Sequence, residues 1–172
     1  ALFDIWMRLL AKVPAGVLWL MEGPGAENLR AAARARGVDP ARLIFARPMP
    51  AAEHLARHRL ADLFVDTLPY NAHTTASDAL WAGLPVLTCK GRAFAGRVGA
   101  SLLHAVGLPE LVTDNLEDYE AMALTLAQDG ARLKTIRARL ADNLAHAPLF
   151  DTARLRRGLE ATLTGLLETA RA

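Results

Sequence analysis

Short apolar runs alternate with amphipathic segments along most of this chain. Strands of a parallel sheet buried on both faces are continuously apolar, whereas covering helices place apolar residues three and four positions apart. The apolar runs predict strands at residues 17–21, 42–46, 63–66, 85–89 and 111–113. The periodic segments predict helices at residues 2–13, 27–36, 50–60 and 75–82, and a long helix that follows residue 89 and ends near Ala105.

This order of strands and helices predicts an α/β fold, a Rossmann-like parallel sheet flanked by helices. Residues 116–172 are predicted to add helices on the outside, interrupted near Gly130 and Pro148. We therefore expect residues 1–172 to form a single lobe. Because helical spacing begins at Leu2 with no preceding cap or start methionine, we also expect the chain to be cut from a longer protein.

The composition narrows the class of protein. With 52% hydrophobic and 22% charged residues, the 172-residue chain can bury a core, which excludes a disordered tail and a collagen-like sequence. The formal net charge is +2 and the sequence has no basic block, so we expect neither a nucleic-acid nor a membrane partner. No apolar run reaches the roughly 20 residues that a helix needs to span a bilayer.

The single cysteine and the tryptophans are interpreted as structural residues. Cys89 cannot form an internal disulfide, so we expect a buried thiol. Because nothing requires an oxidising compartment, we expect a cytoplasmic protein. Trp6, Trp19 and Trp81 fall within periodic apolar patterns, and we expect them in the core.

The loop after the third predicted strand carries the most promising chemistry, because ligands of open α/β sheets bind beyond the carboxyl ends of the strands. This loop follows Asp66 and brings His73, Thr74 and Thr75 to the start of a helix. Free backbone N–H groups and the positive end of the helix dipole favour a phosphate there. Asp78 follows about one helical turn later, where a carboxylate is placed to accept hydrogen bonds from ribose hydroxyls.

Other interpretations of the same residues stay open. Thr75 and Asp78 also fit a capping box, in which each satisfies the other's backbone and neither binds a ligand. His54 and Arg57 lie three positions apart on one predicted helix, a spacing that suits a paired contact with a base or a solvated helical face. No glycine-rich phosphate cradle is present, which weakens the dinucleotide and Walker classes. The histidines have no metal-ligand spacing, so we expect no metal site.

A family resemblance favours the ligand-binding interpretation. Residues 66–86, which include Asp66-Thr67-Leu68-Pro69-Tyr70-Asn71-Ala72-His73-Thr74-Thr75 and Leu80-Trp81-Ala82-Gly83, resemble the signature of the O-linked N-acetylglucosamine transferase family. That family also includes the plant SPINDLY proteins and bacterial homologues. The likeness continues through residues 95–101, reaches back to residues 13–20 and ends near residues 148–152, so it covers most of the chain.

The resemblance implies the C-terminal lobe of a GT-B glycosyltransferase, an inverting enzyme that takes a UDP-sugar and needs no metal. The loop matching His73, Thr74 and Thr75 would hold the diphosphate, and the carboxylate matching Asp78 would hold the ribose. The segment matching residues 49–57 would meet the uracil, with contacts from Met49, His54 and Arg57. The resemblance also implies a protein or peptide acceptor, a second Rossmann-like lobe and N-terminal helical repeats.

Two departures from the family pattern affect donor binding. Ala51 stands where the family commonly carries a lysine, which puts donor affinity or nucleotide preference in question. A second donor-binding lysine of the family precedes the first helix of this lobe, and this chain starts after that point. We name no catalytic residue, because we expect the general base to lie outside this chain.

Three functions follow from this reading. The first is the donor-binding lobe of a glycosyltransferase that transfers N-acetylglucosamine or a related sugar to protein Ser/Thr. The second is a nucleotide-sugar epimerase of related architecture, which needs a carboxylate for proton transfer in the cleft; Asp66 is the candidate. The third is a catalytically silent interaction domain. UDP titration separates the third function from the others, and product analysis separates the first two. The sequence does not name the donor sugar, the acceptor or the oligomeric state.

Overall fold

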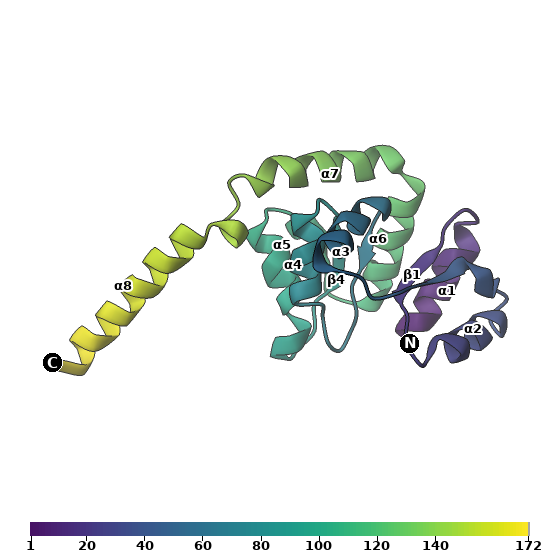
Figure 1. The fold of residues 1–172 in the computed structure, drawn as a ribbon, viewed down its shortest axis with the longest axis horizontal. Coiled ribbons are helices and arrows are strands. Elements are labelled where there is room, and N and C mark those ends of the chain that lie inside the picture. Colours follow the sequence, from purple (N-terminus) through teal and green to yellow (C-terminus); the bar gives the residue numbers. More distant parts are fainter. Residues whose placement is uncertain (172) are drawn as a thin grey trace.

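The computed structural model describes residues 1–171 and has an α/β fold with parallel strands, as expected (Figure 1). The strands are β1 (Leu18–Met21), β2 (Leu43–Ala46), β3 (Phe64–Val65), β4 (Val86–Cys89) and β5 (Val112–Thr113). The α-helices are α1 (Leu2–Lys12), α2 (Ala26–Arg34), α3 (Ala51–Arg57), α4 (Thr74–Trp81), α5 (Val98–Ala105), α6 (Leu116–Gln128), α7 (Gly130–Leu144) and α8 (Thr152–Arg171). Short 3₁₀ turns include η2 (His58–Leu60), η3 (Phe94–Gly96) and η5 (Pro148–Phe150).

The strands form two parallel sheets, β1–β2 and β3–β4–β5, instead of one continuous sheet. Leu18 pairs with Leu43 in the first sheet, and Phe64 pairs with Val86 in the second. The two sheets share a core at Val65, whose side chain packs against the apolar clusters on both sides. The predicted strands therefore exist, and side-chain packing joins the two sheets.

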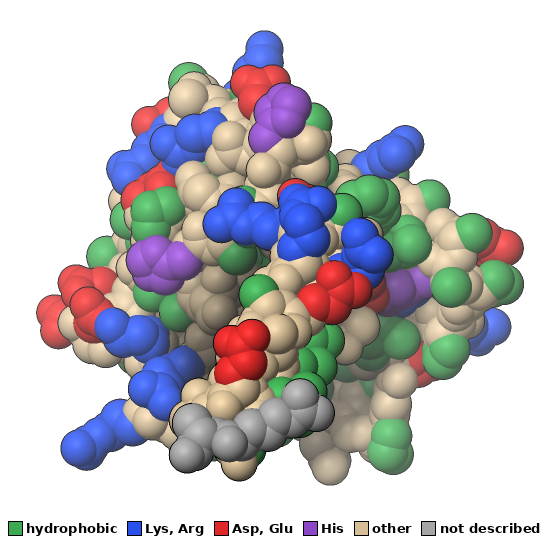
Figure 2. Space-filling model, turned by 90° about the vertical axis from the view of Figure 1, so that its left-hand side faces the viewer, with side chains coloured by type: hydrophobic (Ala, Val, Ile, Leu, Met, Phe, Trp, Pro, Cys, Tyr) green, Lys and Arg blue, Asp and Glu red, His purple; other side chains and the backbone are tan. Residues whose placement is uncertain are grey.

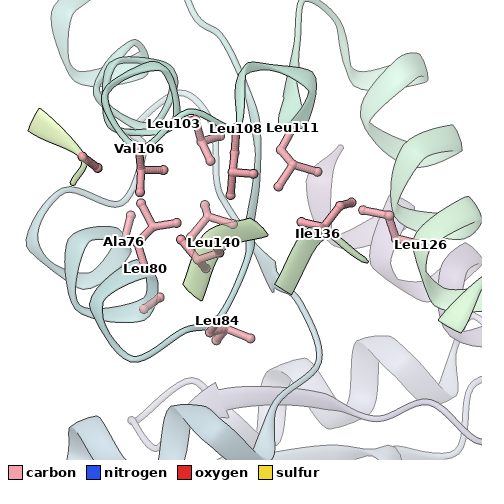
Figure 3. Close-up of a cluster of buried hydrophobic side chains, with 13 residues drawn as sticks. Ala76, Leu80, Leu84, Leu103, Val106, Leu108, Leu111, Leu126, Ile136 and Leu140 are labelled. Atoms are coloured by element: carbon pink, nitrogen blue, oxygen red, sulfur yellow. The ribbon is translucent and has the colours of Figure 1, made fainter. Parts of the chain in front are cut away.

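The β3–β4–β5 sheet is covered on both faces. All four residues of β4 are buried, as its continuous apolar run predicts. Val86 belongs to a cluster formed with α4, α5 and α7, which includes Leu80 and Leu140 (Figure 3). Leu87 belongs to the opposite cluster, which contains Tyr119 of α6. This sheet therefore lies between two apolar clusters.

The β1–β2 sheet is covered mainly on one face. Leu18 and Leu43 pack into the cluster formed with α1 and α2. On the other face Trp19 is 36% exposed and Ile44 is 43% exposed. The expectation that all tryptophans lie in the core is wrong for Trp19 and also for Trp81, which is 58% exposed and packs edge-on against Phe150.

The prediction of a long helix directly after residue 89 is also wrong. A loop and η3 occupy residues 90–97, and α5 begins only at Val98. The glycines explain the break, because a Cβ at Gly96 would lie 3.0 Å from the carbonyl oxygen of Pro69, and one at Gly91 would lie 3.2 Å from the backbone of Gly96. This loop is therefore pressed against the loop that follows β3.

The C-terminal helices are present, with breaks near the two predicted positions. Asp129 caps α7 by accepting a hydrogen bond from the N–H of Arg132 at 2.9 Å. Helix α8 projects away from the body, and its leucines are exposed (Figure 1). On the side of the molecule from which α8 projects, acidic and basic side chains are interspersed (Figure 2). Among residues 1–171, no helix is both long and apolar enough to cross a membrane.

Candidate functional site

The loop after β3 leads into the N-terminus of α4, beside an open cavity of about 490 Å³. His73 is the residue before the helix, and the exposed Thr74 and Thr75 form its first positions. No side chain caps this terminus, so the expected capping box between Thr75 and Asp78 is not formed. The reason is that the helix starts one residue earlier than expected, which places Thr75 inside the first turn. The cavity is lined by Phe64, Thr67, Tyr70, Asn71, Ala72, His73, Thr74 and Thr75.

His73 is held by two aromatic rings. The Tyr70 ring stacks on the imidazole with centroids 4.7 Å apart, and the Phe94 ring meets it edge-on at 6.2 Å. The Nε2 atom of His73 lies 3.3 Å from the carbonyl oxygen of Ala95. No role for Tyr70 or Phe94 beside His73 could be inferred from the sequence, because the contact of Phe94 depends on the loop at residues 90–97 packing against the loop after β3.

Asp66 is buried directly beneath this loop, with 2% of its surface exposed. Its Oδ1 accepts hydrogen bonds from the N–H groups of Thr67 at 2.7 Å and Ala72 at 2.6 Å, and its Oδ2 accepts one from the Thr88 hydroxyl at 2.6 Å. Burial raises the pKa of Asp66, although these bonds and the nearby His73 oppose the rise. The epimerase alternative needs this carboxylate in the cleft, and the structure places it inside the protein instead.

Helix α3 presents His54 and Arg57 toward each other. The Arg57 guanidinium lies 2.5 Å from Nδ1 of His54 and also donates to the carbonyl oxygen of Arg47 at 2.9 Å. It reaches the Met21 sulfur at 3.0 Å and lies 5.8 Å above the Trp19 ring, so it fastens α3 to β1. His54 and Arg57 therefore hold each other in a defined geometry and are not two independently solvated side chains.

Helices α3 and α4 carry the residues that the sequence predicted for the base and the ribose. Burial lowers the pKa of His54, and the charges of Arg57 and His58 lower it further, whereas the carboxylate of Asp78 opposes them. Asp78 is half-buried on α4. Met49 lies on the segment between β2 and α3 and is 39% exposed, without a described contact to His54 or Arg57.

The single cysteine and the possible metal ligands point to no further site among the described residues. Cys89 is buried at the end of β4, and burial raises the pKa of its thiol, which suits a small core residue. In the part of the chain that the structure describes, no cluster of three or more His, Cys, Asp or Glu side chains is arranged to hold a metal ion. The start of α4 and its cavity are therefore the candidate binding site.

Comparison with known proteins agrees with the resemblance drawn from the sequence. The model of glycosyl transferase family 41 matches residues 1–159. A UDP-N-acetylglucosamine–peptide N-acetylglucosaminyltransferase of Caenorhabditis elegans is 38% identical over 150 residues, which are 86% of this chain and 13% of that protein. A protein of Arabidopsis thaliana named "Probable UDP-N-acetylglucosamine--peptide N-acetylglucosaminyltransferase SEC" is 38% identical over 160 residues, which are 91% of this chain and 16% of that protein.

A solved structure gives the same result for the fold. The K341M mutant of the Thermobaculum terrenum O-GlcNAc transferase superposes with a TM-score of 0.88 at 35% sequence identity. The superposition covers 94% of this chain and 32% of that chain. This chain thus spans a minor part of each of these relatives. Since the family model covers almost all of its residues, the chain belongs to glycosyl transferase family 41.

Proposed function

We propose that this chain is the UDP-sugar-binding lobe of an inverting GT-B glycosyltransferase that transfers N-acetylglucosamine, or a related sugar, to Ser or Thr of a protein. The observation that carries the proposal is the uncapped start of α4, where His73, Thr74 and Thr75 line an open cavity. The names of the worm and plant relatives support the same donor and a peptide acceptor. This lobe would supply the donor side of the reaction.

The diphosphate binds at the start of α4 in this proposal. The first N–H groups of the helix point out of its N-terminus, and the hydroxyls of Thr74 and Thr75 add donors beside them. During transfer, an acceptor oxygen forms a bond to C1 of the sugar while the bond from C1 to the β-phosphate oxygen breaks. The negative charge that develops on the leaving UDP is stabilised by these donors, and no metal is required.

The nucleoside binds between α3 and α4. His54 and Arg57 are held together on α3, and Asp78 is half-buried on α4. In our proposal Asp78 accepts hydrogen bonds from the ribose hydroxyls, while His54, Arg57 and Met49 meet the uracil. Much of the Arg57 guanidinium already contacts Arg47 and Met21, so this side chain fixes the base site as well as contacting the base.

The remaining parts of the reaction belong to the longer protein in this proposal. A second lobe supplies the general base, and helical repeats hold the peptide acceptor. We propose a cytoplasmic setting, which agrees with the buried free thiol of Cys89. Nucleic acid and membrane are not among the proposed partners.

Titration of this chain with UDP tests the proposal. Combining Thr74→Ala with Thr75→Ala should weaken UDP binding by about tenfold to a hundredfold per lost bond, because a hydrogen bond to a charged group contributes about 1.5–3 kcal/mol. Calorimetry in the presence of a chelator measures the affinity and tests metal independence together. The matched control combines Thr162→Ala with Thr164→Ala on the exposed helix α8, where we expect no change in affinity.

The outcomes separate the three functions. Unchanged affinity in the Thr74/Thr75 variant would overturn the phosphate assignment. A wild-type chain that binds no UDP would favour the silent interaction domain. Epimerised UDP-sugar formed by the complete protein without an acceptor would favour the epimerase.

A further inference from the structure

The loop between Asp66 and His73 is held from beneath by one carboxylate. Asp66 is almost fully buried. Its Oδ1 accepts hydrogen bonds from the N–H groups of Thr67 and Ala72, which lie at opposite ends of the loop. One oxygen atom therefore closes the loop. Ala72 directly precedes His73, the N-cap residue of α4, so the Ala72 bond also fixes where the helix starts.

Asp66 is itself fixed by the elements around it. The Thr88 hydroxyl on β4 donates to Oδ2 at 2.6 Å, and the Tyr119 hydroxyl on α6 donates to the backbone carbonyl of Asp66 at 2.9 Å. On α5, a Cβ at Gly99 would lie 2.6 Å from Oδ2, so the helix backbone lies directly against the carboxylate. The carboxylate has little room to move.

The rest of the loop depends on the same anchor. The side-chain amide of Asn71 donates to the Thr67 carbonyl at 2.8 Å, and the Asn71 N–H donates to the Ala95 carbonyl at 2.9 Å. Removing the carboxylate would leave the N–H groups of Thr67 and Ala72 without their partner. A buried donor without a partner is costly, so the loop would move to reach water.

We propose that Asp66 is a positioning residue for donor binding, because it holds the loop and the start of α4 in the arrangement that receives the diphosphate. The inference rests on the proposed function. Asp66 touches no part of the ligand and acts through Thr67, Ala72 and His73.

The test compares Asp66→Ala, Asp66→Asn and Thr113→Val for binding of UDP and of uridine. Asp66→Ala removes both loop bonds, so UDP affinity should fall about tenfold if the competent loop falls to about a tenth of the population. Uridine affinity should change by less than about twofold, since uridine has no phosphate to meet the loop. Asp66→Asn keeps an oxygen that accepts both N–H groups, and it should restore most of the UDP affinity.

Thr113→Val is the matched control for damage to buried polar groups. It removes the hydrogen bond from the buried Thr113 hydroxyl to the Thr88 carbonyl and leaves the bonds of Asp66 in place, so it should lower the melting temperature without weakening UDP binding. Two results would overturn the proposal at a temperature where all variants are folded. One is equal UDP affinity for wild type and Asp66→Ala, and the other is an equal loss in Thr113→Val.

Amide hydrogen exchange tests, without any ligand, whether Asp66 anchors the loop. The Ala72 amide of the wild-type chain should exchange slowly, and Asp66→Ala should accelerate it while Asp66→Asn does not. Rapid exchange at Ala72 in the wild type overturns the inference even if Asp66→Ala fails to fold. If the wild type binds no UDP, the proposed function fails, and slow Ala72 exchange still supports the anchoring of the loop by Asp66.

Discussion

The β3–β4–β5 sheet is buried between helices on both faces, whereas the β1–β2 sheet packs on α1 and α2 and exposes Trp19 and Ile44 on its other face. Both sheets contribute to the candidate site. The β3–β4–β5 sheet supports the loop that we propose binds the diphosphate, through buried hydrogen bonds around Asp66. The β1–β2 sheet supports α3 through the exposed contacts of Arg57. The comparison shows two ways to place a binding group, one from within the core and one across its surface.

The largest expected difference between the two regions is in stability. Leu103→Ala empties a fully buried position on α5 and should lower the free energy of unfolding by about 2–5 kcal/mol. Ile44→Ala changes a side chain that is 43% exposed on β2 and should cost less than about 1 kcal/mol. Urea denaturation of both variants measures these values. Equal losses would remove the distinction between the two sheets.

A smaller effect is expected where α5 meets Asp66. Gly99→Ala places a Cβ 2.6 Å from the carboxylate and 2.7 Å from the Thr88 hydroxyl, so it should cost about 1–3 kcal/mol and weaken UDP binding. Gly130→Ala is the control, because a Cβ there meets nothing within 4 Å and should stabilise α7 by about 0.4–1 kcal/mol. Denaturation and UDP titration of both variants check this. A Gly99 variant as stable as the Gly130 variant would contradict the close approach.

The smallest expected effect is a pH dependence of stability. The folded-state pKa of Asp66 lies above its ordinary value of 3.8, because burial disfavours the ionised carboxylate. Between these two pKa values the folded chain binds more protons than the unfolded chain, so the contribution of Asp66 to stability falls as the pH rises through the folded-state pKa. Asp66→Asn lacks this titration, and its free energy of unfolding should rise relative to wild type from pH 4 to pH 8. Parallel curves would show that burial does not perturb Asp66.

Local sequence patterns predicted most of the regular elements. The apolar run at residues 85–89 identified β4 because a strand covered on both faces needs no polar position. The segment at residues 90–97 could not be predicted in the same way. Gly91 lies against Leu68 and Gly96 lies against Pro69, in each case more than twenty residues away along the chain. The spacing of apolar residues does not reveal such contacts.

In the candidate site, too, local sequence predicted some residues, whereas the roles of others depend on contacts between distant segments. His73, Thr74 and Thr75 could be identified because they are consecutive and lie at the start of a helix. A common site for His54 and Asp78 is implied only by the family resemblance, since it depends on how α3 and α4 pack. The sequence places Asp66 at a strand end, where an epimerase would need a carboxylate, but its role in holding the loop could not be predicted, because its three hydrogen-bond donors come from the loop and from β4.

Because Gly99 lies so close to Asp66, the residues at these two positions cannot vary independently. A side chain at position 99 needs the space that the Asp66 oxygen occupies, so a larger residue there is compatible only with a smaller residue at position 66. Substitutions at the two positions are therefore epistatic. A library designed to alter donor preference should hold this pair constant and vary the exposed ring of Tyr70, where a change leaves the anchor beneath the loop intact.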